Sequence, residues 1–150
     1  MNLLCGMLLL SSFGHVRYFS SVLYGQILLG PGTSRYETIF TVTAQKETRS
    51  TLELFTDKGE PMTASFVDET GNAASVGSSF EFFLRPDRPV RFRLALLPDE
   101  AGNDILVKTG WATFQSSEDI DALETVRITT ADGKLIDRHF MMSETPPTGE

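Results

Sequence analysis

The chain has 150 residues, of which 41% are hydrophobic and 22% are charged, and its formal net charge is -7. This length fits one domain, the eleven phenylalanines are enough to build a core, and the charged fraction is too low for a disordered polyelectrolyte. The negative charge argues against nucleic acid and anionic lipid surfaces, because both attract positively charged proteins.

The N-terminus opens on an apolar run, residues 3–10, which is shorter than the about 20 residues that a membrane span needs. Residues 1–14 are therefore expected to be a signal peptide or the remnant of a leader, with Ser12 and Gly14 as the small residues before cleavage. No Lys or Arg precedes the apolar run, which a secretory leader normally has. Two alternatives stay open: a misplaced start codon, or a first strand that includes residues 8–10.

Residues 90–96 illustrate the pattern that dominates the rest of the chain. Val90, Phe92, Leu94 and Leu96 alternate with Arg91 and Arg93, which is the period of two of a half-buried strand. Similar segments recur about every ten residues and predict an antiparallel sandwich or barrel of about eight short strands. The expected strands are 36–44, 51–55, 62–67, 80–84, 90–96, 105–114, 125–129 and 135–141, and an apolar run at 22–29 precedes them.

Turn chemistry separates these segments. Asp132-Gly133 lies between two apolar runs and is the strongest hairpin signal of the chain, and Asp57-Lys58-Gly59 is a second. Residues 68–78 are polar and lack periodicity, which indicates a loop, whereas Ser117 could cap a helical turn over 117–123. Residues 143–150 form a polar, proline-containing tail that is expected to be flexible.

Few residues of the sequence suggest catalysis or metal binding. A Ser-His-Asp triad would have to use His139 with Asp137, and no nucleophile-elbow motif accompanies them. The acidic residues near Asp99 and Asp119 lack the spacing of a calcium loop, and the single cysteine, Cys5, cannot form a cysteine-based zinc site. We therefore expect no enzymatic activity, no metal and no cofactor.

Four arginines, Arg85, Arg88, Arg91 and Arg93, lie along and before one strand, with Asp87 among them. They could form an anion-binding patch, but a solvated strand face is the better interpretation, because these arginines are spaced out rather than in a run.

The aromatic side chains offer a candidate ligand site. Trp111, Tyr36 and Tyr24 could stack on a sugar ring if they were exposed on one surface, with Tyr18 nearby in sequence. The middle of a strand, beside a glycine that permits close approach, favours a core position for Trp111 instead. Ordinary strand packing is likewise the better interpretation for the tyrosines.

Several segments together resemble a known kind of module. These are residues 25–42, 51–62, the strand that ends at Leu96, 109–112, and the hairpin at 132–133. In this order they are similar to an uncharacterised immunoglobulin-like β-sandwich module of exported bacterial proteins. The resemblance covers about residues 20–141 and implies a terminal or repeated module of a surface protein, without catalytic residues. The chain departs from the pattern in having only Gly30 and Gly32 in the glycine-rich turn, and in its acidic loop near Asp99.

The sequence thus predicts an all-β protein, an antiparallel β-sandwich of immunoglobulin-like architecture at residues 20–142. The expected function is that of a non-catalytic structural or adhesive module of an exported or cell-surface bacterial protein. Its expected partner is a protein or a glycan, with no nucleic acid and no membrane span, and the chain is expected to be a monomer or one module of a larger protein. The alternative is a carbohydrate-binding module that uses exposed aromatic residues.

Overall fold

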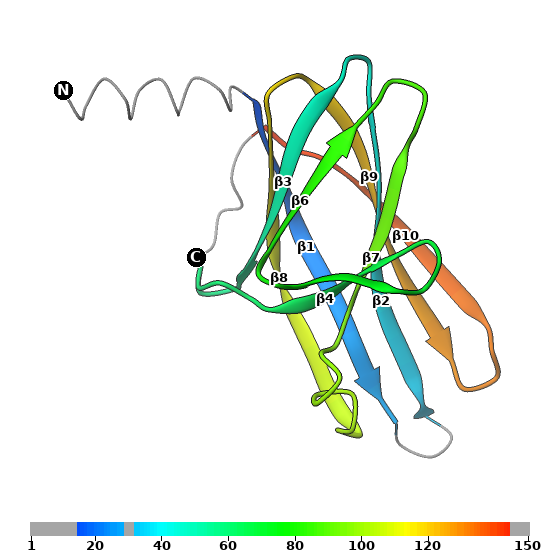
Figure 1. Cartoon of the computed structure of the whole chain (residues 1–150). Coiled ribbons are helices and arrows are strands. Elements are labelled where there is room, and N and C mark those ends of the chain that lie inside the picture. Colours follow the sequence, from blue (N-terminus) through cyan, green and yellow to red (C-terminus); the bar gives the residue numbers. More distant parts are fainter. Residues whose placement is uncertain (1–14, 29–31, 145–150) are drawn as a thin grey trace.

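The computed structural model describes residues 15–28 and 32–144, and all its strand pairings are antiparallel (Figure 1). The all-β, antiparallel prediction is confirmed, with ten strands instead of about eight. The immunoglobulin-like sandwich is not confirmed, because all ten strands belong to one hydrogen-bonded sheet. The strands are β1 (His15–Ile27), β2 (Ser34–Ala44), β3 (Thr48–Thr56), β4 (Ala64–Asp68), β5 (Ala73–Gly77), β6 (Ser79–Leu84), β7 (Val90–Ala95), β8 (Ile105–Ser116), β9 (Ile120–Thr130) and β10 (Leu135–Met141).

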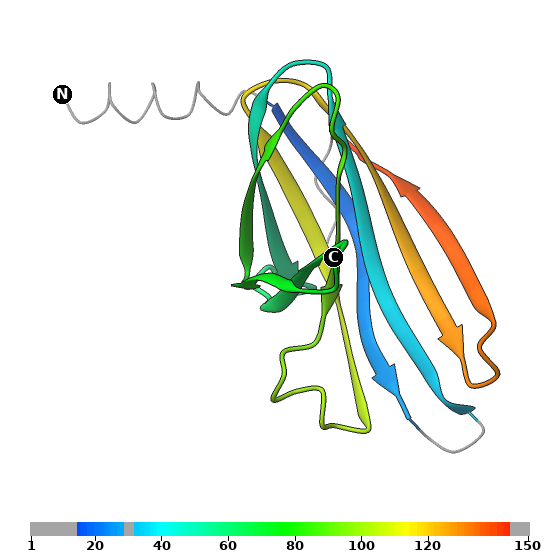
Figure 2. The same ribbon diagram turned by 45° about the vertical axis from the view of Figure 1, so that its right-hand side comes forward.

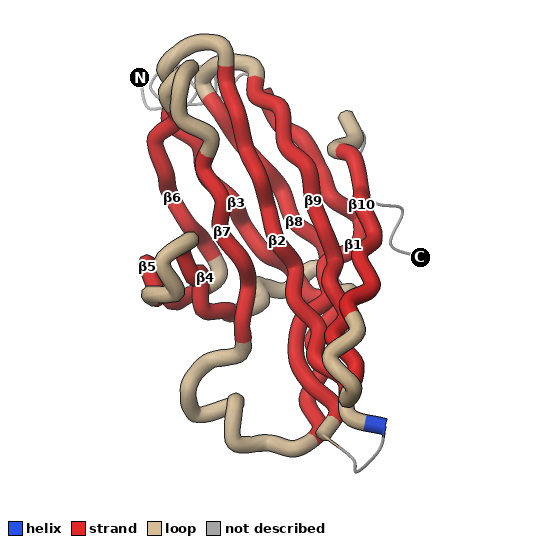
Figure 3. The backbone as a smooth tube through the Cα atoms, turned by 90° about the vertical axis from the view of Figure 1, so that its right-hand side faces the viewer, coloured by secondary structure: helices blue, strands red, loops and turns tan. Residues whose placement is uncertain are grey.

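The strands form one strongly curved sheet that is nearly closed into a barrel. Eight of them follow the order β5-β4-β7-β2-β1-β8-β3-β6, and the two end strands, β5 and β6, are separated in sequence only by Ser78. The remaining two, β9 and β10, extend the sheet from the other edge of β2 (Figure 2). The tube in Figure 3 shows β9 and β10 beside β2, with β10 outermost.

Strand β2 sets this arrangement because it pairs with three strands. On one edge, residues 34–36 pair with β1 and residues 38–42 pair with β7, so that β1 and β7 diverge from each other along β2. The opposite edge pairs with β9 over residues 34–44. The interior that opens between the diverging strands is filled by the core.

The core is mainly aromatic, as the phenylalanine content predicts. Ring centroids within it lie 5.1–6.3 Å apart, in the range of favourable aromatic pairs. The contributing rings are Phe19, Phe40, Phe66, Phe80, Phe82, Phe92 and Phe114. Leu52, Leu54, Leu84 and Leu94 complete it.

Two local predictions are wrong. The helical turn expected over 117–123 does not form, because β9 begins at Ile120 and alternates Ile120 and Ala122 into the interior. The polar stretch 68–78, expected to be a loop, contains β5, which pairs with β4. Backbone pairing to a neighbouring strand stabilises such a segment even though its sequence has little strand signal.

The domain boundaries can be compared with the sequence only inside the described residues. The sheet begins at His15, before the expected boundary at residue 20. At the other end, Ser143 exchanges two backbone hydrogen bonds of 2.8 Å with Tyr18, so the ordered chain extends past residue 142. The expected signal peptide, residues 1–14, and residues 145–150 of the expected tail lie outside the described residues.

The predicted hairpin at Asp132-Gly133 is confirmed. Gly133 has a φ of +83°, and its N–H donates to the carbonyl of Thr130, whose own N–H donates to the carbonyl of Lys134. This left-handed conformation suits glycine because a Cβ atom would crowd the backbone there.

We expect Gly133→Val to destabilise the protein by about 1–3 kcal/mol and Lys134→Val by less than about 0.5 kcal/mol. Apart from Gly133 and its two chain neighbours, no atom lies within 4 Å of where a Cβ would be, so the penalty comes from the local backbone conformation alone. Urea denaturation of the two variants measures the difference. Equal losses would show that the turn does not require a positive φ at this position.

Candidate functional site

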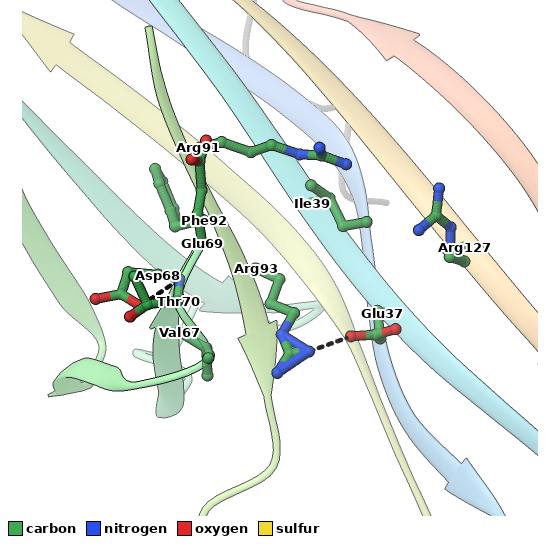
Figure 4. Close-up of a pocket in the computed structure, with 11 residues that line it drawn as sticks. Glu37, Ile39, Val67, Asp68, Glu69, Thr70, Arg91, Phe92, Arg93 and Arg127 are labelled. Carbon is green, nitrogen blue, oxygen red and sulfur yellow. Dashed lines mark hydrogen bonds and ion pairs between the residues drawn. The ribbon is translucent and has the colours of Figure 1, made fainter. Parts of the chain in front are cut away.

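A hollow on the described surface lies on the outer face of β7, β2 and β9 (Figure 4). It has a volume of about 570 Å³ and is open to solvent. Its lining is mostly charged: Glu37, Asp68, Glu69, Arg91, Arg93 and Arg127, with Ile39, Val67, Thr70, Gly71 and Phe92. Alternation along β7 places Arg91 and Arg93 outward while Phe92 packs inward, as the sequence pattern predicts.

Two ion pairs neutralise most of the positive charge on this face. Arg93 of β7 donates to Glu37 of β2 at 2.8 Å. Arg127 of β9 makes two parallel hydrogen bonds of 2.9 Å to Asp137 of β10, a bidentate geometry. The hydrogen bonds from Arg127 lower the pKa of Asp137 below its ordinary value, and Asp137 raises the pKa of Arg127. Because both pairs are partly solvated, each adds little to stability.

The carboxylate at the rim of the hollow is also satisfied. Asp68 accepts hydrogen bonds from the hydroxyl of Thr70 and from the backbone N–H groups of Thr70 and Asn72. These bonds, the Thr70 hydroxyl first, lower the pKa of Asp68. Asp68 thus stabilises its own turn, and the charges of the hollow are directed at one another more than at a ligand.

The His139 region does not assemble a triad. The Nδ1 atom of His139 lies 2.9 Å from the hydroxyl of Thr125, whereas Asp137 is bonded to Arg127. An acid that orients a catalytic histidine must hydrogen-bond its imidazole, and the hydrogen bonds of Asp137 go to Arg127 instead. These contacts between β9 and β10 are exposed, so the four side chains form a ladder on the protein surface.

The three aromatic residues singled out in the sequence do not share a surface. Tyr24 is fully buried, and its hydroxyl donates to the carbonyl of Thr63 at 2.8 Å. Burial, with a smaller contribution from Glu100, raises the pKa of Tyr24. Tyr24 therefore presents no ring face to a ligand. Tyr36 is half-buried, on β2.

Trp111 lies on the outer face of β8 and is half-buried, since alternation along the strand turns the side chains of Ala112 and Phe114 to the interior. Its ring stacks on Phe55 of β3, with centroids 4.4 Å apart, and lies 6.5 Å from Tyr18 of β1. The interior position expected for Trp111 is therefore wrong. The cluster of Tyr18, Phe55 and Trp111, termed here the aromatic cluster, is one that sequence proximity could not show, because its members come from three strands.

Strand β10 presents the most exposed apolar side chains next to an open backbone edge. In the described part of the chain β10 pairs only with β9, and all of its residues except Phe140 are exposed. Met141 is 73% exposed, Leu135 54% and Ile136 38%. Apolar residues at an unpaired strand edge favour the addition of another strand. The sequence identified this strand but not that its second edge is open.

One buried group is chemically unusual. Both carboxyl oxygens of Glu124 on β9 are buried and have no hydrogen-bond partner in the described structure. Glu124 lies opposite Phe40 of β2 and Phe140 of β10. Burial raises its pKa to about 8 from an ordinary value of 4.5. Because the Glu124 side chain is fully buried, a substrate in solution cannot contact its carboxyl group directly.

Two further properties of the described residues concern metal ions and membranes. Among residues 15–28 and 32–144, no three His, Cys, Asp or Glu side chains gather closely enough to hold a metal ion. That same part of the chain contains no helix long and apolar enough to cross a membrane.

Comparisons with known proteins give little more. No protein-family model and no curated protein sequence matches the chain. A solved structure, the crystal structure of Thermotoga maritima 1070, aligns with a TM-score of 0.45 and 11% sequence identity, over 87% of this chain and 93% of that one. None of these findings supports the resemblance to an exported immunoglobulin-like module.

Proposed function

We propose that this protein is a non-catalytic contact module, an immunoglobulin-like domain of an exported or cell-surface bacterial protein. In this proposal it binds an extended segment of a partner protein along the open edge of β10. The observation that carries the proposal is this edge, with three exposed apolar side chains, Leu135, Ile136 and Met141. Export is supported by the apolar run at residues 3–10.

Strand addition suits this edge for a backbone reason. An edge strand has unpaired N–H and C=O groups along its whole length, and a partner strand satisfies them without a concave pocket. The side chains of the added strand, which alternate between the two faces of the sheet, then give specificity through their contacts with neighbouring residues. The hollow beside β7 is a weaker candidate, because its arginines Arg93 and Arg127 are already paired with carboxylates.

The proposal is tested by panning a display library of seven-residue peptides against the wild-type protein and against His139→Pro. Proline at 139 would remove a backbone donor from the open edge. We expect peptides that bind the wild type and are lost with the variant, whereas His139→Ala, which keeps that donor, retains them. Peptides that bind all three proteins equally, or no enrichment at all, would contradict strand addition at β10.

The second claim of the proposal, that the protein has no catalytic activity, is tested with a panel of ester, peptide and glycoside substrates. No turnover is expected above that of a blank preparation. Turnover that survives repurification of the protein would defeat the proposal, whatever the peptide library shows.

A second candidate, carbohydrate binding, is favoured by the aromatic cluster of Tyr18, Phe55 and Trp111 on the outer face of β1, β8 and β3. Stacked aromatic rings with a solvent-facing side can pack on a sugar ring. On a glycan array, this candidate predicts saturable binding to one glycan class. That binding would be lost in Trp111→Ala and kept in Phe83→Ala, which removes an exposed ring elsewhere.

A further inference from the structure

The sequence of β10 is nearly palindromic in residue type. Leu135 and Ile136 at one end correspond to Met141 and Phe140 at the other, and Asp137 corresponds to His139, with one arginine in the middle. We propose that the segment that pairs with β10 is the β10 strand of a second copy of this chain. The two strands would run antiparallel around a two-fold axis at Arg138. This inference rests on the proposed function, since it names the partner of the same edge.

The hydrogen-bond pattern of the hairpin shows which backbone groups are open. The Thr130 N–H donates to the Lys134 carbonyl, so this pair is a hydrogen-bonded one, and such pairs alternate along an antiparallel ladder. Residues 136, 138 and 140 are therefore bonded to β9. The N–H and C=O groups of residues 135, 137, 139 and 141 point to the open edge. Ser143 continues this alternation, because its N–H and C=O are bonded to Tyr18 on that side.

Only one two-fold register pairs all four residues whose backbone groups face the open edge, 135, 137, 139 and 141, with residues of the same strand in the second copy. An axis at Arg138 pairs residue 137 with 139 and residue 135 with 141. An axis at Asp137 would extend into the turn at Gly133 and would place Asp137 opposite itself. An axis at His139 would require Ser143, whose backbone groups are already bonded to Tyr18. Backbone geometry thus favours the axis at Arg138.

Side-chain chemistry favours the same register. It places Asp137 opposite His139 of the second copy, and it pairs Leu135 with Met141 and Ile136 with Phe140. Apolar cross-strand pairs stabilise a sheet, and a carboxylate opposite an imidazole puts no like charges against each other. In this register the apolar side chains exposed in one copy are covered by those of the other.

One contact opposes the pairing and limits its strength. Arg138 would lie opposite Arg138 of the second copy across the axis. Like charges directly opposite each other are destabilising. Arg138 is exposed, and the described structure gives it no ion pair, so solvent screens this repulsion. A contact of one strand on each side is also smaller than a standard interface. The expected dissociation constant is on the order of 10–100 µM, as for weak, transient contacts.

The repulsion at the axis provides a test of both partner and register. Wild type is mixed with Arg138→Glu, and the dimers are counted by native mass spectrometry, which separates them by mass. Heterodimers would pair Arg138 with a glutamate and should exceed the about one-half share that random mixing gives. A random share, or no dimer at all, would overturn the inference. Because Arg138 is exposed, its replacement leaves the core unchanged.

Sedimentation velocity on the full chain, from about 1 µM to 1 mM, gives the second test. Wild type should change from monomer to dimer over this range. His139→Pro should remain monomeric, and His139→Ala should still dimerise because it keeps the backbone donor. A His139→Pro variant that dimerises like wild type would overturn the inference. If the peptides of the library bind but no dimer forms, the contact-module proposal stands and only the identity of its partner is wrong.

Discussion

Replacing Glu124 with methionine is expected to stabilise the protein, most strongly at alkaline pH. The wild-type side chain is buried with both oxygens unpartnered, and burial raises its pKa to about 8. Methionine has a similar length and no polar group to desolvate. The substitution thus removes a buried carboxyl without leaving a cavity.

The sign of the pH dependence follows from proton binding. Below the ordinary pKa of 4.5, the Glu124 carboxyl is protonated in both the folded and the unfolded protein. Between about pH 4.5 and 8 the folded state still holds the proton that the unfolded state has lost, so the free energy of unfolding falls as the pH rises. Above pH 8 the free energy of unfolding falls no further on account of Glu124. The whole fall amounts to about 3–5 kcal/mol.

No charged neighbour accounts for this shift. The side chains that share the face of Glu124 on adjacent strands are Phe40 and Phe140 at its own level, and Val126 lies next along β9. Arg138 lies opposite Val126 and is exposed. Burial is therefore the cause, in agreement with the direction of the pKa change.

Urea denaturation at about pH 5 and pH 8.5 measures the effect, with Glu81→Met as the control because Glu81 is an exposed carboxylate in β6. The difference between wild type and Glu124→Met should grow by several kcal/mol from the lower to the higher pH. Glu81→Met should show no such growth. An equal difference at both pH values would show that Glu124 ionises normally in the folded protein.

Phe40→Ala is expected to destabilise the protein by about 3–5 kcal/mol. Phe40 is fully buried on β2, and its ring lies 5.3–5.5 Å from the rings of Phe19, Phe92 and Phe114. Its loss leaves a cavity between strands that diverge at this point. Because most domains have only about 5–15 kcal/mol of stability, the variant should lose a large share of it.

The control for Phe40 is Phe83→Ala, which removes a ring that is 49% exposed. Its expected cost is below about 1 kcal/mol. Both are measured by the shift of the urea midpoint at constant slope. Similar costs for the two variants would contradict the position of the core.

The parts of the fold that sequence could predict are those with local signals. Alternation around Phe92 and the Asp132-Gly133 turn each depend on adjacent residues, and both are confirmed. Gly110, expected to permit close approach, does so: a Cβ there would lie 2.0 Å from the carbonyl oxygen of Phe55. Strand β5 was missed because its stabilisation comes from pairing with β4, which a polar local sequence does not show.

The same limit applies to the candidate site. In 105–116 apolar residues occur on both faces, so alternation alone could not decide that Phe114 lies in the core and Trp111 outside it. Glu124 shares its strand face with Ala122 and Val126, which is visible in the sequence. The sequence pattern, however, predicts a strand that begins at Thr125 and so excludes Glu124. The pairing of Arg93 with Glu37 depends on the sheet order and has no local signal.

The open edge of β10 is the central claim, and amide hydrogen exchange resolved by residue tests it most directly. In dilute protein, the amides of Leu135, Asp137, His139 and Met141 should exchange rapidly, whereas those of residues 136, 138 and 140 should be protected by β9. At about 1 mM the first set should become protected as the second copy binds, and the second set should change little. Protection of both sets in dilute protein, or none gained by the first set on concentration, would contradict the account.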